Sequence, residues 1–136
     1  MTYDGGCLCG AVRYRANCEP VDVGYCHCRM CQVSSGAPVL PWASFAIDSF
    51  AYVQGEPARY RSSPRGWREF CGNCGAQLTF RDKQTPALVD VNVGTLSEPA
   101  AVSPSYHIWY ASRIAWFETT DDLPRYPGEL PDPEQG

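Results

Sequence analysis

Two short cysteine motifs in this sequence have the spacing of a closed metal site. Residues 71–75 read CGNCG, and two residues between thiols form a tight turn that brings both sulfurs to one tetrahedral ion. The glycine after the second thiol permits a positive φ, so that backbone N–H groups can point at the sulfurs. Residues 7–10 read CLCG, where the two thiols share a face of extended chain. The predicted ligands of a structural zinc are therefore Cys7, Cys9, Cys71 and Cys74, with unrelated buried thiols as the alternative.

A third motif packs three thiols into six residues. Residues 26–31 read CHCRMC, in which Cys26 and Cys28 point one way and a turn returns Cys31 to them. No second knuckle remains to complete a tetrahedron. These three cysteines are therefore predicted to hold a second, reactive zinc whose fourth position is left for water or substrate.

Two alternatives to an open second site remain. One is a closed structural zinc completed by Cys18 or by a distant histidine, and the other is an empty or redox-active thiol cluster. Cys18 has no partner at metal spacing, so we interpret it as a plain thiol. His27 points away from its two cysteine neighbours and is expected to be packed or hydrogen-bonded rather than a ligand.

Length and composition limit the class of protein in which these motifs occur. The 136 residues are enough for one domain around one core, and a hydrophobic fraction of 44% is that of an ordinary globular protein. The net charge of −4 becomes more negative when thiolates bind metal, and no Lys/Arg cluster offsets it, which argues against nucleic acid as a partner. No apolar run approaches the ~18 residues of a membrane span. The first residues lack the pattern of a signal peptide, so a reducing cytoplasm is the expected compartment, where eight cysteines indicate metal rather than disulfides.

The elements expected to carry the cysteines are short strands. Apolar alternation and turn residues predict strands at 10–15, 21–27, 39–45, 50–54, 58–62, 77–81 and 88–93. One helical turn is expected over 29–35, directly after the second thiol of the CHCRMC motif. The proline-rich chain from about residue 123 is expected to end as irregular, partly mobile chain. The fold class is thus mainly β, a single domain over 1–136 whose sheets are tied by metal.

Taken in order, the motifs resemble those of a known family. The segments are GCLCGAVRY at 6–14, CHCRMC at 26–31 and FCGNCG at 70–75, with weaker matches SGAP at 35–38, RYRSS at 59–63 and YHIW at 106–109. This set is similar to the glutathione-dependent formaldehyde-activating enzyme family, which also includes centromere protein V. The resemblance runs from about residue 5 to 127.

The resemblance implies a fold, a cofactor and a reaction. The fold would be a β-tent, in which small antiparallel sheets are pinned by zinc. Two zinc ions per chain would occupy the positions already inferred from spacing, with Cys26, Cys28 and Cys31 holding the reactive one. The implied activity is that of a carbon–sulfur lyase joining glutathione and formaldehyde as S-(hydroxymethyl)glutathione, or acting on a related thiol–aldehyde adduct.

Residues around the second site have candidate roles in such a reaction. Arg61, Arg65 or Arg68 could pair with substrate carboxylates, although each is equally well read as a solvated strand residue. His107 could shuttle protons, although packing against Trp109 in a strand is the favoured interpretation. Two other functions stay open: a carrier that binds a thiol without turnover, and a zinc-stapled scaffold for a protein partner.

Overall fold

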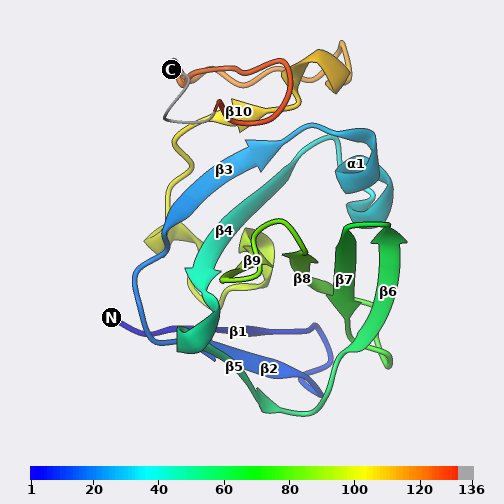
Figure 1. Cartoon of the computed structure of the whole chain (residues 1–136), viewed down its shortest axis with the longest axis vertical. Coiled ribbons are helices and arrows are strands. Elements are labelled where there is room, and N and C mark those ends of the chain that lie inside the picture. Colours follow the sequence, from blue (N-terminus) through cyan, green and yellow to red (C-terminus); the bar gives the residue numbers. More distant parts are fainter. Residues whose placement is uncertain (132–136) are drawn as a thin grey trace.

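Short strands dominate the architecture (Figure 1). A computed structural model describes residues 1–131 as ten strands, one α-helix and four 3₁₀ helices; the last five residues of the predicted tail, 132–136, lie outside the described part. The strands are β1 (Tyr3–Gly6), β2 (Arg13–Ala16), β3 (Asp22–Cys26), β4 (Leu40–Ala46), β5 (Phe50–Gln54), β6 (Ala58–Ser63), β7 (Gly66–Phe70), β8 (Gln77–Asp82), β9 (Leu88–Asn92) and β10 (His107–Ile108). The helix α1 spans Arg29–Ser35, and the 3₁₀ helices are Ile47–Ser49, Val93–Thr95, Pro99–Ala101 and Tyr110–Ser112. The predicted mainly β fold class is confirmed.

The strands form two sheets of unequal size. The small sheet has the order β1-β2-β5 and is antiparallel throughout. The large sheet has the order β10-β3-β4-β9-β8-β7-β6 and curves over the small one, as Figure 1 shows. All its pairs are antiparallel except β10 with β3, where His107 pairs with Tyr25 in parallel register. Among residues 1–131 this is the one parallel strand pair, and it makes the large sheet mixed rather than antiparallel.

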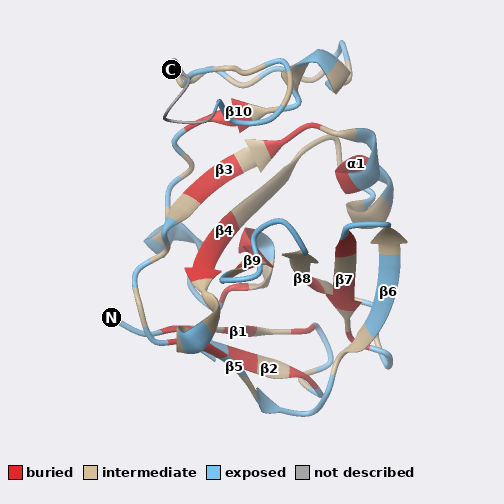
Figure 2. Cartoon of the chain, in the orientation of Figure 1, coloured by how far each residue is buried: buried red, intermediate tan, exposed pale blue. Residues whose placement is uncertain are grey.

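The hydrophobic core lies where the two sheets face each other (Figure 2). Its largest fully buried side chains are Tyr14 of β2, Phe45 of β4 and Leu78 of β8. A Cβ on Gly5 would lie 2.3 Å from the Tyr14 hydroxyl, so β1 can pack against this ring only with glycine there. Cys7 and Cys71 belong to the same core cluster. The first predicted zinc site is therefore built into the core.

The structure contains each of the seven predicted strands, with ends shifted by up to three residues, and adds three that the sequence pattern did not indicate. β1 contains two glycines, and β10 has only two residues. β7 was missed because it buries charges: Arg68 and Glu69 are both less than a tenth exposed. Glu69 accepts hydrogen bonds from the Thr79 hydroxyl at 2.6 Å and from Nε of Arg81 at 2.7 Å, which satisfies the carboxylate inside the protein.

The helix and the C-terminal segment flank the second cysteine motif. The predicted helical turn is present as α1, which begins after Cys28 and ends at Gly36 with φ +69°. Through residue 128 the tail is hydrogen-bonded to β10 and to the residues that follow it. His107 N–H donates to the carbonyl of Pro124, and Tyr126 N–H donates back to the carbonyl of His107, both at 2.9 Å. No helix among residues 1–131 is long and apolar enough to cross a membrane.

Candidate functional site

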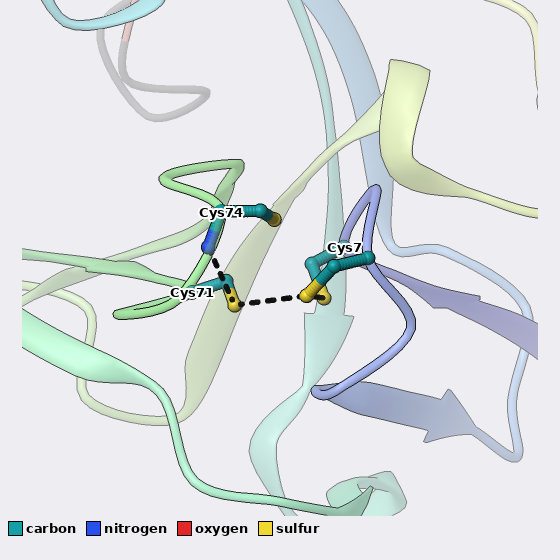
Figure 3. A group of neighbouring side chains, drawn as sticks. Cys7, Cys71 and Cys74 are labelled. Atoms are coloured by element: carbon teal, nitrogen blue, oxygen red, sulfur yellow. Dashed lines mark hydrogen bonds between the residues drawn. The ribbon is translucent and has the colours of Figure 1, made fainter.

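Four cysteines from two hairpin connections meet at the closed cluster. Cys7 and Cys9 follow β1, and the other two, Cys71 and Cys74, lie between β7 and β8. All four sulfurs lie within 4.8 Å of one another, and Figure 3 shows Cys7, Cys71 and Cys74 converging. Cys9 Sγ is 3.6 Å from the sulfur of Cys7 and 3.7 Å from that of Cys71. A tetrahedral zinc with bonds of about 2.3 Å spaces its sulfurs by about 3.8 Å, so this donor set fits zinc.

Backbone N–H groups surround these sulfurs, as the glycine after the knuckle predicted. Gly75 has φ +79°, and the N–H groups of Asn73 and Cys74 each donate to Cys71 Sγ at 3.4 Å. Hydrogen bonds from the backbone N–H of Ala76, and then of Cys9, lower the pKa of Cys74 to about 6. The loop therefore favours thiolate, the form that binds metal.

The three-cysteine cluster is assembled within one segment. Cys26 ends β3, Cys28 is the N-cap of α1, and Cys31 lies in the first turn of the helix. The Cys28 sulfur accepts the Cys31 N–H at 3.3 Å, and the sulfurs of Cys26 and Cys31 are 3.2 Å apart. All three sulfurs lie within 4.8 Å of one another, a donor set that could hold a metal ion.

Within residues 1–131 this cluster has three candidate ligands and not four. No further His, Cys, Asp or Glu joins the three sulfurs, and Cys18 packs instead against the core between the sheets. Hydrogen bonds from Cys26 and then Cys31 hold the pKa of Cys28 far below its ordinary value, while pairing with Cys28 raises the pKa of Cys26. Negative charge thus concentrates on Cys28, the sulfur of the cluster that is least buried.

A buried chain of hydrogen bonds runs from the CHCRMC motif to the C-terminal segment. Nε2 of His27 is 2.8 Å from Nδ1 of His107, and Nε2 of His107 is 3.0 Å from Oδ1 of Asp121. His27 is therefore hydrogen-bonded, as the sequence indicated, and lies outside the metal cluster. His107 is packed in a strand, but its ring stacks on Tyr25 with centroids 4.7 Å apart rather than on Trp109.

The carboxylate at the end of this chain sets the histidine tautomers. Asp121 accepts the proton on Nε2 of His107, so Nδ1 of His107 accepts from Nε2–H of His27. Nδ1 of His27 is then an acceptor, and it is buried without a hydrogen-bond partner in the described chain. Burial, followed by the nearby positive charge of Arg125, lowers the pKa of His27 to about 4, so the ring is neutral near pH 7. Asp121 carries no spacing signal in the sequence and was not predicted.

The three candidate arginines have different environments. Arg65 pairs with Asp82 at 2.9 Å and Glu129 at 3.0 Å, and Arg61 donates to a backbone carbonyl of its own hairpin turn. Arg68 is buried, its guanidinium lies 4.9 Å from the Phe80 ring centre, and its Nη2 is 4.0 Å from Sγ of Cys31. Of the three, only Arg68 reaches the cysteine cluster.

A cavity of about 490 Å³ opens beside this cluster, between α1 and the strands β6, β7 and β8. Its volume is in the range of small-molecule sites. Arg68 lines the cavity and also contacts Cys31, so it connects the two. The lining residues are Arg29, Met30, Val33, Ser34, Tyr60, Ser62, Arg68, Phe70 and Gln77. Of these, only Arg68 was a candidate from the sequence.

One known protein family matches most of this sequence. The profile of the family described as glutathione-dependent formaldehyde-activating enzyme matches residues 2–112, which include both cysteine clusters. The chain belongs to this family. The resemblance inferred from the cysteine motifs is thereby confirmed.

One sequence relative and one solved structure of similar fold extend the comparison. A Schizosaccharomyces pombe protein, named an uncharacterized lyase, is 32% identical over 78 residues, covering 57% of this chain and 56% of the relative. The chain thus aligns with little more than half of that relative's length. A crystal structure of a Rhodobacter sphaeroides protein superposes with a TM-score of 0.58 at 22% identity, covering 90% of this chain and 98% of its own. At this identity the likeness shows the fold.

Proposed function

We propose that the chain is a zinc-dependent carbon–sulfur lyase acting on a thiol–aldehyde adduct, for which glutathione and formaldehyde are the pair that the family description suggests. The observation that carries the proposal is the three-sulfur cluster, which offers one ligand fewer than the closed site and shares Arg68 with a cavity of substrate size. The structural zinc would sit on Cys7, Cys9, Cys71 and Cys74. A reducing cytoplasm is the compartment in which such thiols stay available.

The proposed reaction balances without an oxidant or reductant. A carbon–sulfur bond forms between the thiol sulfur and the aldehyde carbon, and the thiol proton ends on the former carbonyl oxygen. Zinc, when bound by Cys26, Cys28 and Cys31, would supply a Lewis acid that lowers the pKa of a thiol and polarises a carbonyl. Arg68 would hold an anionic group of the thiol through its guanidinium, and the apolar side chains of the cavity wall would pack against the rest of the adduct.

Binding and turnover test this proposal separately. Calorimetric titration with glutathione, in buffers of different ionisation enthalpy, should report release of about one proton per site near neutral pH. S-methylglutathione has no thiol proton and should bind more weakly. An exchange assay with formaldehyde then asks whether adduct formation exceeds the spontaneous rate, with Cys31→Ser as the inactive variant and Cys18→Ser as its matched control.

The outcomes separate the three functions. Acceleration that is lost in Cys31→Ser supports the lyase. Thiol binding without acceleration would favour a carrier, and no binding of any thiol would leave the scaffold as the remaining function.

A further inference from the structure

One wall of the cavity beside the three-cysteine cluster consists of alternate side chains of β6 and β7. On β6, Tyr60 and Ser62 point into the cavity, whereas Arg59 and Arg61 point to the opposite face and lie over the Trp67 ring. On β7, Arg68 and Phe70 point inward in the same way. α1 closes the other side with side chains from its first two turns. The cavity is therefore a groove between a helix and one face of a sheet.

Apolar side chains make up most of this wall. Met30, Val33 and Tyr60 are 48%, 71% and 65% exposed, although each is large and hydrophobic. Phe70 lies deeper, on the sheet side. Exposed hydrophobic side chains gathered around one concavity mark a binding site more often than hydrophobic residues scattered singly do. The occupant therefore needs an apolar body.

The charged side chains that line the cavity are both positive. Arg29 and Arg68 line it, and no aspartate or glutamate among the described residues does. Buried arginines are normally paired with carboxylates. Arg68 is 8% exposed, yet in residues 1–131 no carboxylate lies within 4.0 Å of its guanidinium, whose polar contact is the Cys31 sulfur. An anionic group on the occupant would pair with the remaining N–H donors.

A second polar group in the wall also lacks a partner. Oγ of Ser62 is buried and makes no hydrogen bond within the described chain. Ser62 lines the same cavity as Arg68 and Phe70. A buried hydroxyl without a partner carries a free-energy cost that a ligand oxygen can remove. Ser62 thus adds a second polar group to the wall on which Arg68 stands.

We propose that this cavity binds a thiol adduct with an apolar, aromatic or branched aliphatic body and a single carboxylate, in preference to glutathione; this rests on the lyase chemistry proposed above. Glutathione carries two carboxylates, an ammonium group and two peptide bonds. Its ammonium has no acidic partner on the wall, and its backbone would cover Met30, Val33 and Phe70 with polar groups. A benzyl or branched alkyl group instead removes apolar surface from water on both the ligand and the cavity wall.

Calorimetry on the zinc-loaded protein can test this preference with defined probes. 2-Benzyl-3-sulfanylpropanoate has one thiol, one ring and one carboxylate, and it should bind at least about tenfold more tightly than glutathione. Its carboxamide analogue keeps the ring and thiol but loses the charge. It should bind at least about tenfold more weakly than the acid to wild type, and this difference should shrink in Arg68→Gln.

Two exposed valines provide a matched pair of variants. Val33→Asp places a carboxylate at the mouth of the cavity and should weaken the acid probe at least about tenfold. Val21→Asp introduces the same charge at a position of similar exposure that does not line the cavity, and it should leave binding unchanged. Both positions are outside the core, so neither substitution should disturb folding. The melting temperatures of the two variants check this.

The result that overturns the inference differs from the one that overturns the lyase. The inference is overturned if glutathione binds as tightly as the benzyl probe. It is also overturned if the Val33→Asp variant binds the benzyl probe as tightly as the Val21→Asp variant does. Either result would hold even if the protein is an active lyase. If 3-phenylpropanoate, which has no thiol, binds in a Val33-dependent way but no thiol–aldehyde reaction is accelerated, the cavity assignment is supported and the lyase is overturned.

Discussion

Nε2 of His27 donates to Nδ1 of His107 across 2.8 Å, and the two residues are 80 positions apart in the chain. His27 lies between two cysteines of the open cluster, and the neighbouring Gln32 side chain holds its carbonyl at 2.7 Å. His107 is in turn fixed by Asp121 and by stacking on Tyr25. The loop that carries the three sulfurs is therefore positioned by the C-terminal segment as well as by β3 and α1.

Replacing Asp121 with alanine should destabilise the zinc-loaded protein. The carboxylate accepts hydrogen bonds from His107, from the Leu123 N–H at 3.1 Å and from Arg125 at 3.3 Å. Losing it leaves a buried histidine without its acceptor, a change that costs on the order of 2 kcal/mol. Urea denaturation followed by circular dichroism would measure the loss.

The neighbouring residue supplies the control for this prediction. Asp122 is exposed and has the same charge, so Asp122→Ala should change the free energy of unfolding by less than about 0.5 kcal/mol. Equal effects of the two substitutions would show that the link between His107 and Asp121 does not stabilise the fold.

The cysteine clusters and most strands could be predicted because their signals are local. The CGNCG and CLCG motifs contain the turn glycines that aim N–H groups at sulfur, and alternation of apolar residues is visible within five or six positions. In the structure, Gly10 and Gly75 both have φ near +80°, as those motifs require. Local geometry of this kind depends on residues that are neighbours in the sequence, so it can be predicted from one sequence.

The rest of the site depends on contacts between distant segments. Arg68 was one of three equivalent candidates because its burial depends on contacts with Phe80 of β8 and Cys31 of α1, which no short pattern reveals. Asp121 stands beside another aspartate, and nothing local distinguishes the one that caps His107. β10 is too short for its periodicity to be seen, and its parallel pairing with β3 is purely tertiary.

Asp90 should make stability depend on pH in a defined direction. Burial raises its pKa from 3.8 to about 6, although the Ser44 hydroxyl donates to it and opposes the shift. Between these two values the folded state binds more protons than the unfolded state, so this contribution to stability decreases as pH rises through the window. Above pH 6 the ionised carboxylate costs on the order of 2 kcal/mol.

The variant Asp90→Asn removes this cost and keeps an oxygen for the Ser44 hydroxyl. It should be more stable than wild type at pH 7.5, and its advantage should shrink as the pH is lowered to 5. Denaturant titrations of both proteins at each pH measure the difference in their free energies of unfolding. Any loss of metal that the two proteins share does not contribute to this difference. Asp48→Asn, at an exposed position, is the matched control; an advantage for Asp90→Asn that grows toward acid would mean the opposite sign.

Metal analysis should find close to two zinc ions per chain in protein purified under reducing conditions without chelator. The four-sulfur cluster lies partly within the core, whereas the open cluster has only three candidate ligands among residues 1–131. A chelator should therefore remove one equivalent quickly and the other slowly. Elemental analysis is the measurement, and a finding of no zinc, or of iron instead, would contradict the assignment of both clusters.

The two clusters should differ in what they contribute to folding. Cys9 and Cys71, whose sulfurs are 3.7 Å apart, are separated by 62 positions, so a metal there links the loop after β1 in the small sheet to the β7–β8 loop in the large one. A metal on Cys26 and Cys31 closes a segment of only six residues, most of which is already ordered by β3 and α1. Closing the longer loop removes more entropy from the unfolded chain.

Serine substitutions measure this difference directly. Cys74→Ser should destabilise the protein by more than about 3 kcal/mol or prevent folding, because structural zinc supplies folding free energy. Cys31→Ser should lower zinc content by about one equivalent while most β structure and stability remain. Cys18→Ser controls for loss of a thiol outside both clusters. Thermal melts in which Cys74→Ser and Cys31→Ser lose equal stability would contradict the division into a structural and a reactive site.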